Sequence, residues 1–436
     1  MPQYPKILTI GIDGLPYTFL QSLAEQGVTP NLKTLLDSGI SKSILSTIPD
    51  ISSTAWTGFM TGVNPGEHGI YGFYEPGQDY KLRFPTARDI QSPAVWQQLG
   101  RLNKKSLIIN MPQTYPALPL NGALISGFVA PDFEKSVYPS KYLETLKNLN
   151  YQIDVNAWLA RTDQDQFFEQ LFQVLERRMA GIDFLWDQEV WDFATIVFTG
   201  TDRLQHYFWD AVEDQSHQYH QRVMEFYHEI DNAVGKLLES VDNSTMVIVL
   251  SDHGFTKVVR EVNLNVWLQQ NDYLKFRQSE PESLEDIDAE SAAFCVDPGR
   301  IFINRSDRFA GGKIHPGKEF LEIQFELKAR LESEIIIRDP LGEKVNPVEK
   351  VVFPEEIYSG PLLNRAPDLI VLAKPGFDLK GNVKIDELAR NDVLTGMHTR
   401  DNASLIVHNK SPHFDFDVIK SIEEIAPQLL RCYTND

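Results

Sequence analysis

The sequence contains little cysteine and no long apolar run. Its two cysteines, Cys295 and Cys432, are far apart in a chain of 436 residues and outside any metal-binding spacing. A disulfide framework is therefore not expected, and a cytoplasmic location fits this cysteine content. No apolar stretch reaches the roughly 20 residues of a transmembrane helix, and the N-terminus lacks the pattern of a signal peptide. We expect a cytoplasmic protein without a membrane span.

Positive charge is also scarce. The chain has 41 Lys and Arg residues against 61 Asp and Glu residues, which gives a formal net charge of -20. This acidic excess argues against a protein that wraps nucleic acid or binds an anionic membrane surface. Some of the carboxylates are instead candidates for holding cations. The hydrophobic content of 42% is ordinary for a globular protein.

Short apolar runs that end in polar turns predict buried strands. The clearest runs are residues 6–12, 193–198 and 246–250. In an open α/β sheet, ligands bind in the crevice beyond the carboxyl ends of the strands. The residues that follow these runs are therefore the first candidates for a functional site.

Acidic and histidine side chains recur at or beside these strand ends. They are Asp13, Asp202, His206, Asp252, His253 and His398. The spacing of four between Asp202 and His206 places both on one face of a helix. Taken singly, each residue has an ordinary explanation, such as a capping aspartate or a loop histidine. Together they supply carboxylate and imidazole ligands for two divalent cations such as Zn²⁺ or Mn²⁺.

A cluster of hydroxyl residues, Ser52, Ser53 and Thr54, precedes a short helix predicted near residues 55–60. One of them could simply cap the helix. Alternatively, one could be a nucleophile at a helix N-terminus, where free backbone N–H groups favour a phosphate. The start of the helix does not decide between these two roles.

Five segments in order along the chain resemble the alkaline phosphatase superfamily, and most closely its type I phosphodiesterase/nucleotide pyrophosphatase branch. They are GIDG around Asp13, AWTGFMTGVNPGEHGI from Ala55, FTGTDRLQHYFW around Asp202, SDHGF around Asp252 and TGMHT around His398. The resemblance covers nearly the whole chain. It implies an enzyme that hydrolyses phosphoric esters, with a small-molecule phosphate ester as its substrate.

The resemblance also assigns roles to the candidate residues. Asp13, Asp252 and His253 would hold one metal together with the nucleophile, and Asp202, His206 and His398 would hold the other. Alignment on Ala55, Trp56 and Thr57 places the nucleophile at Ser52. The implied mechanism is in-line attack on phosphorus with a phosphoseryl intermediate. Zn²⁺ is the expected metal, and Mn²⁺ is the alternative.

The sequence departs from the family pattern directly after the nucleophile. Characterised nucleotide pyrophosphatases have Phe-Pro-Asn there, whereas this chain has Ser53, Thr54 and Ala55. The group that stabilises the transition state must therefore differ, and Ser53 or Thr54 remains an alternative nucleophile. A phosphomonoesterase, a phosphomutase, a phosphonate hydrolase and an inactive metal-binding relative are the alternative functions.

The expected fold is a three-layer α/β/α sandwich with a largely parallel central sheet. Its core is expected to contain residues 1–130, 191–273 and 345–436. Residues 131–190 are expected to form a helical insertion, and residues 274–344 a second one. The two insertions would act as a cap beside the site.

Overall fold

The computed structural model describes residues 5–434, which divide into two compact units. Unit 1 contains residues 5–64, Thr86–Phe255 and residues 398–434. Unit 2 contains Pro65–Pro85 and Thr256–Met397. None of the helices between residues 5 and 434 combines the length and apolar character that crossing a bilayer requires.

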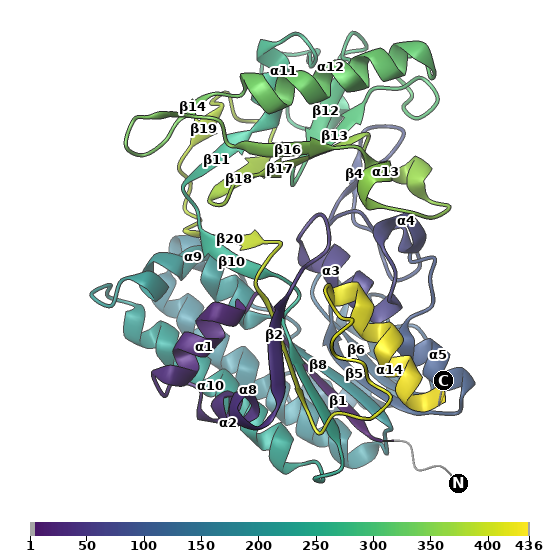
Figure 1. Ribbon diagram of the computed structural model, residues 1–436, viewed down its shortest axis with the longest axis vertical. Coiled ribbons are helices and arrows are strands. Elements are labelled where there is room, and N and C mark those ends of the chain that lie inside the picture. The colour runs from purple at the N-terminus through teal and green to yellow at the C-terminus, as the bar shows by residue number, and fades with distance from the viewer. Residues whose placement is uncertain (1–4, 435–436) are drawn as a thin grey trace. The chain divides into compact units, whose positions relative to one another are not determined.

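Unit 1 is built on an eight-stranded sheet (Figure 1). In spatial order its strands are β2 (Ile40–Ile44), β21 (Ala403–His408), β9 (Met246–Leu250), β1 (Ile7–Ile12), β8 (Phe193–Phe198), β5 (Ser106–Met111), β6 (Gly122–Ser126) and β7 (Val137–Tyr138). The five strands from β9 to β6 are parallel, and antiparallel strands flank them on both sides. Because the central strands run in one direction, their carboxyl ends meet at one edge of the sheet.

Side chains of the central strands enter two separate cores, one on each face of the sheet. Ile10 and Ile12 of β1 belong to one core, whereas Ile7 belongs to the other. The first face is covered by α1 (Tyr17–Glu25), α2 (Pro30–Ser38), α8 (Gln164–Gln188), α9 (Gly200–Glu213) and α10 (His220–Glu239). The second is covered by α3 (Ser52–Thr61), α5 (Val95–Arg101) and α14 (Ile425–Thr434). This arrangement confirms the expected three-layer α/β/α sandwich.

The helical segment 131–190 lies within unit 1 rather than apart from it. It contains α6 (Leu143–Asn148), α7 (Leu159–Thr162) and α8. Phe167 and Phe168 of α8 are fully buried in the same core as Ile10 of β1. The apolar face of α8 therefore packs in one helical layer of the sandwich.

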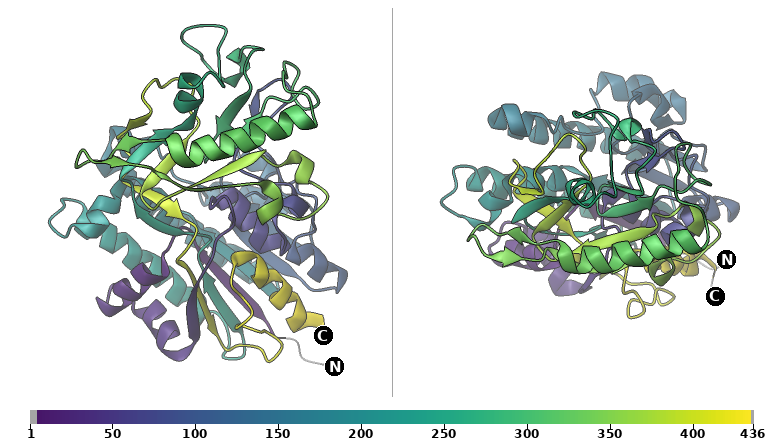
Figure 2. Two further views of the ribbon diagram at one scale, coloured as in Figure 1. Left: turned by 45° about the horizontal axis from the view of Figure 1, so that its top comes forward. Right: turned by 90° about the horizontal axis from the view of Figure 1, so that it is seen from above.

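Unit 2 has its own core, and its two largest sheets have four and three strands. One sheet contains β12 (Ala293–Val296), β13 (Arg300–Ile303), β17 (Leu369–Ala373) and β16 (Val348–Val352), and the other contains β18 (Phe377–Lys380), β11 (Arg260–Asn263) and β19 (Ala389–Arg390). Helix α12 (Lys318–Glu334) lies along β16 (Figure 2). Helix α11 (Leu264–Gln270) packs near β12. The shorter elements of this unit are α4 (Pro65–His68), β3 (Glu75–Pro76), β4 (Leu82–Arg83), β14 (Ile337–Arg338), β15 (Lys344–Val345) and α13 (Pro354–Ile357).

Unit 2 is larger than the expected insertion 274–344. Strand β17 lies in the segment 345–436 that was expected in the core, but it pairs with β13 and β16 of unit 2 and not with the central sheet. An apolar run predicts that a strand is buried, yet it carries no information on which sheet the strand joins. The boundaries of the two units therefore differ from the expected ones.

Candidate metal centre

Three ligand candidates from two neighbouring strands lie together in unit 1. Asp13 follows β1, and Asp252 and His253 follow β9, which pairs in parallel with β1. All three side chains are fully buried. His253 Nε2 lies 3.3 Å from Asp252 Oδ2 and 3.6 Å from Asp13 Oδ1. We call Asp13, Asp252 and His253 the first ligand group.

The hydroxyl of Ser52 lies against this first ligand group. Ser52 is the first residue of α3, and its Oγ donates to Asp13 Oδ1 at 3.2 Å. The same Oγ lies 3.2 Å from His253 Nε2. Ser53 Oγ and Thr54 Oγ1 are buried and have no hydrogen-bond partner within residues 5–434. Of the three candidate hydroxyls, Ser52 therefore has the contacts with the ligand candidates.

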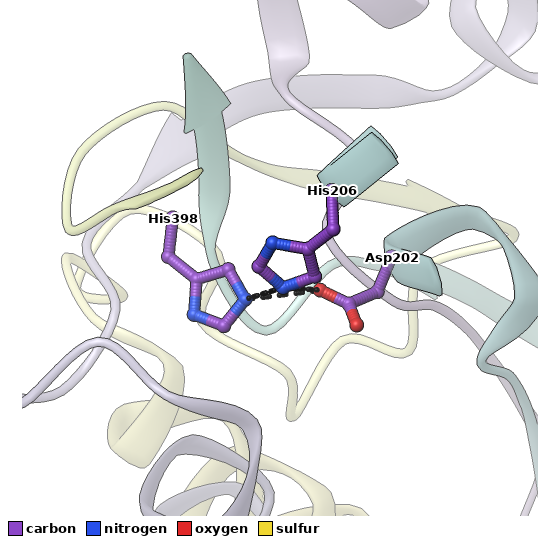
Figure 3. A group of neighbouring side chains, drawn as sticks. All are labelled: Asp202, His206 and His398. Carbon is purple, nitrogen blue, oxygen red and sulfur yellow. Dashed lines mark hydrogen bonds and ion pairs between the residues drawn. The ribbon is translucent and has the colours of Figure 1, made fainter. Parts of the chain in front are cut away.

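The second ligand group contains Asp202, His206 and His398 (Figure 3). Asp202 and His206 lie one turn apart on α9, which follows β8, and His398 lies on the short strand β20 (Gly396–Thr399). His398 Nε2 is 3.0 Å from both Asp202 Oδ1 and His206 Nε2. His206 Nε2 is 3.3 Å from the same Asp202 oxygen. Three ligand atoms thus converge on one point.

The two groups adjoin each other through their histidines. The rings of His253 and His398 stack with centroids 3.7 Å apart and an angle of 26° between their planes. His253 Nε2 lies 3.9 Å from Asp202 Oδ1. The His206 and His398 side chains are 21% and 14% exposed, whereas His253 is fully buried. The second group is therefore the one that solvent can reach.

The spacing of the ligand atoms fits divalent metal ions. A tetrahedral Zn²⁺ with bonds of roughly 2.0–2.2 Å keeps its ligand atoms about 3.3–3.6 Å apart. The separations between each histidine Nε2 and the other ligand atoms of its group run from 3.0 to 3.6 Å. One carboxylate oxygen, Asp252 Oδ2, is buried without a hydrogen bond from residues 5–434, so it has an acceptor position to offer to an ion.

The charges of the first group also call for a cation. Burial, together with the neighbouring Asp252 and Asp202 carboxylates, raises the pKa of Asp13 well above its usual value. Burial likewise raises the pKa of Asp252 to about 7, and the hydrogen bond from Gly14 N offsets only part of that rise. Buried carboxylates of like charge destabilise one another unless a cation offsets them. A dication between them supplies that charge.

Two backbone carbonyls orient the histidines. His398 Nδ1 lies 3.0 Å from Asp50 O, and His253 Nδ1 lies 3.0 Å from Gly254 O. Because a carbonyl oxygen can only accept, each Nδ1 must carry the proton and donate. This tautomer leaves the Nε2 lone pair free for a metal. Burial, with the adjacent His253, lowers the pKa of His398 to about 3, which favours the same neutral form.

Sequence reasoning did not identify three residues that support the site. Trp56 Nε1 donates to Asp13 Oδ2 at 3.0 Å. Phe255 packs its ring against His206 and His398, with centroids 5.0 and 5.4 Å away. Arg203 Nη1 donates to Asp202 Oδ2 at 3.2 Å. The first of these had a sequence signal, because Trp56 follows Ser52 by four residues on one helix face.

Two histidines with helical spacing, His217 and His220, take no part in either group. His217 Nε2 lies 3.7 Å from Asp210 Oδ2, and His220 Nδ1 lies 2.7 Å from Ala211 O. His217 precedes α10, which begins at His220, and both histidines serve local contacts near the end of α9.

Structures of similar fold cover almost the whole chain. Phosphonoacetate hydrolase from Sinorhizobium meliloti 1021, solved with phosphonoformate, shares 15% identity, with a TM-score of 0.63 over 98% of this chain and 96% of the other. Alkaline phosphatase PafA gives a TM-score of 0.62 at 14% identity over 99% and 96% of the two chains. Murine ectonucleotide pyrophosphatase/phosphodiesterase 5 gives 0.58 at 15% identity over 99% and 95%.

Similarity at the level of sequence comes from a family model. No curated protein sequence matches the chain. The model of the type I phosphodiesterase/nucleotide pyrophosphatase family matches residues 7–401, which include all of the candidate site residues. This match confirms the expected class of enzyme, a phosphoric ester hydrolase. The chain belongs to the type I phosphodiesterase/nucleotide pyrophosphatase family.

Proposed function

We propose that the protein is a dinuclear metal-dependent phosphodiesterase that attacks phosphorus through the hydroxyl of Ser52. The observation that carries this proposal is the position of Ser52 Oγ, 3.2 Å from both Asp13 Oδ1 and His253 Nε2 at the start of α3. A hydroxyl at this position combines an adjacent metal site with a helix N-terminus that favours phosphate.

Two divalent ions, when bound, would activate the nucleophile and stabilise negative charge on the oxygens of an in-line displacement. The first ligand group and Ser52 would hold one ion, and the second ligand group would hold the other. Zn²⁺ suits a set of imidazole and carboxylate ligands, and Mn²⁺ is the alternative.

The proposed reaction follows an order of bond changes that begins at Ser52. Ser52 gives up its proton toward Asp13 Oδ1, and its Oγ forms a bond to phosphorus. The bond to the ester leaving group breaks with its electron pair, and solvent protonates that group. The N-terminus of α3, the positive end of the helix dipole, favours the charge of the phosphoryl group. Water then attacks the phosphoserine, the Oγ–P bond breaks, and Ser52 regains its proton.

Substrate choice is proposed to depend on unit 2. The chain enters this unit at Thr256, three residues after His253, and leaves it at Met397, directly before His398. A segment connected to both ligand groups in this way is suited to act as a cap that selects the size of the ester. Family membership favours diesters over monoesters, although the Phe-Pro-Asn of nucleotide-cleaving members is absent. A cytoplasmic location is proposed from the two free, buried cysteines.

The test combines metal analysis with two model substrates. The protein is reconstituted with Zn²⁺ or Mn²⁺, and its metal content is determined by elemental analysis. The same preparation is then assayed for hydrolysis of bis-p-nitrophenyl phosphate and of p-nitrophenyl phosphate. Two ions per chain with faster cleavage of the diester is the expected result. Faster cleavage of the monoester would indicate a phosphatase. Two ions without either activity would favour a mutase, a phosphonate hydrolase or an inactive relative.

Ligand variants test the division into two sites. His253→Ala and His398→Ala are each expected to lose one ion and the activity, because each removes one ligand from a different group. His217→Ala is the matched control, since His217 contacts Asp210 and Tyr219 rather than a ligand candidate, and this variant should keep both ions. Retention of both ions in the first two variants would refute the assignment.

A further inference from the structure

The two carboxylate oxygens of Asp202 have different surroundings. Oδ1 faces the second ligand group, at 3.0 Å from His398 Nε2 and 3.3 Å from His206 Nε2. Oδ2 points away from the two histidines (Figure 3) and lies 3.2 Å from Arg203 Nη1. The carboxylate is buried, with its side chain only 3% exposed. Its orientation is therefore set by protein contacts on both sides.

Arg203 is itself fixed in place. Its Nε and Nη2 donate to Asp154 Oδ2 at 3.1 and 2.9 Å, and its guanidinium lies 4.7 Å from the ring centroid of Phe128. The Arg203 and Asp154 side chains are 21% and 20% exposed. A planar guanidinium held by several hydrogen bonds has a defined direction, which a lysine ammonium would lack. Arg203 thus links Asp154 to Asp202 in a rigid chain of ion pairs.

The ion pair between Arg203 and Asp202 gives the two ligand groups different charge environments. The first group has two carboxylates, Asp13 and Asp252, and within residues 5–434 neither forms an ion pair with an arginine or lysine side chain. The second group has one carboxylate, and it shares its charge with Arg203. Asp154 in turn offsets the positive charge of Arg203, so that the arginine does not repel a cation with its full charge.

We propose that Arg203, held by Asp154, is a positioning residue that keeps Oδ2 of Asp202 turned away from the metal, so that Asp202 binds through Oδ1 alone. This inference rests on the proposed dinuclear site. A carboxylate that offers one oxygen occupies one coordination position. The ion of the second group, on the solvent-accessible side, then keeps positions open for the substrate and water. Catalytic metal sites characteristically retain such open positions.

The test uses Co²⁺ as the probe, because its visible absorption weakens as its coordination number rises. Wild type and the variants Arg203→Met, Arg203→Lys and Asp154→Asn are loaded with Co²⁺, and the affinity of each ion is measured by competition with a chelator. Asp165→Asn is the matched control. Asp165 pairs with Arg222 at 3.3 Å in the same unit and contacts no ligand candidate.

Arg203→Met and Asp154→Asn are expected to weaken the binding of one of the two Co²⁺ ions roughly 10- to 100-fold, as is typical for groups that orient a metal ligand. In Arg203→Met the absorption of that ion should also fall, because Asp202 can then bind through both oxygens. Arg203→Lys should give intermediate values. The control should match wild type in both measurements.

A second experiment, in a protein that already carries His206→Ala, shows which of the two ions Arg203→Met affects. His206→Ala removes a ligand of the second group, so only the ion of the first group should remain. Adding Arg203→Met to this protein should leave the affinity of the remaining ion unchanged. Equal weakening of both ions, or weakening of the ion in the His206→Ala background, would overturn the inference in favour of a general loss of structure.

The outcomes separate this inference from the proposed function. If wild type binds fewer than two ions, the dinuclear site itself is refuted. If wild type binds two ions and the folded Arg203→Met and Asp154→Asn proteins bind both with unchanged affinity and absorption, only the positioning role is refuted. Should Arg203→Met fail to fold, Asp154→Asn carries the test, because it keeps the guanidinium.

Discussion

At the scale of single residues, the three adjacent hydroxyls have different surroundings although they share one turn of chain. Ser52 Oγ contacts Asp13 and His253, whereas Ser53 Oγ is buried without a partner among residues 5–434. Ser52→Ala is therefore expected to lower phosphoryl transfer at least about 10³-fold while metal content stays near that of wild type. Ser53→Ala is the matched control and should remain active. Full activity of Ser52→Ala would reassign the nucleophile.

At the scale of elements, β1 and α3 pack closely because Gly11 of β1 has no side chain. A Cβ on Gly11 of β1 would lie 2.4 Å from Trp56 Cη2 on α3. Gly11→Ala is expected to displace α3, costing about 1–3 kcal/mol of stability by overpacking, and to lower kcat because Ser52 begins that helix. Gly100→Ala in α5 meets only Asn121 Cβ at 3.7 Å and should gain about 0.5–1 kcal/mol. Denaturant unfolding and kinetics measure both effects.

A partly buried carboxyl beside α3 predicts a dependence of stability on pH. Glu423 packs against Gly58 of α3, and burial raises its pKa from 4.5 to about 7. Below pH 4.5 the carboxyl is protonated in both the folded and the unfolded state. As pH rises from 4.5 to 7, the unfolded state ionises first, so stability should fall by up to about 3 kcal/mol.

Glu423→Gln removes the titrating carboxyl, so the fall in stability with rising pH should become smaller. Unfolding curves at pH 5 and pH 8 measure the difference from wild type. The exposed Glu25→Gln on α1 is the control and should leave the dependence unchanged. An equal decline in wild type and Glu423→Gln would contradict the assignment to Glu423.

At the scale of the whole molecule, metal binding is expected to contribute to the stability of unit 1. The buried carboxylates of Asp13, Asp202 and Asp252 repel one another without a cation. Removal of the ions with a chelator should lower the Tm, because a metal present at 100 times its Kd stabilises the fold by about 2.7 kcal/mol. Ser52→Ala should show the same drop, since its carboxylates remain. An unchanged Tm would contradict a metal centre.

The sequence by itself determined the class of fold and the edge at which the candidate site lies. Buried parallel strands appear as short apolar runs, and their carboxyl ends meet at one edge of a sheet. Asp13, Asp252 and His253 lie within three residues of the ends of such runs, and Asp202 and His206 share a helix face after another run. These positions are local in sequence, so periodicity and spacing were sufficient to bring them forward as candidates.

Tertiary structure alone decided which partners meet across long stretches of chain. Asp154 and Arg203 are 49 residues apart, and neither lies in a pattern that names the other. Strand β17 lies in unit 2 and not in the core, where segment 345–436 was expected. Helix α8, in the expected insertion 131–190, belongs to a helical layer of the sandwich. An apolar pattern states that a surface will be buried, whereas the packing of the whole chain determines what it is buried against.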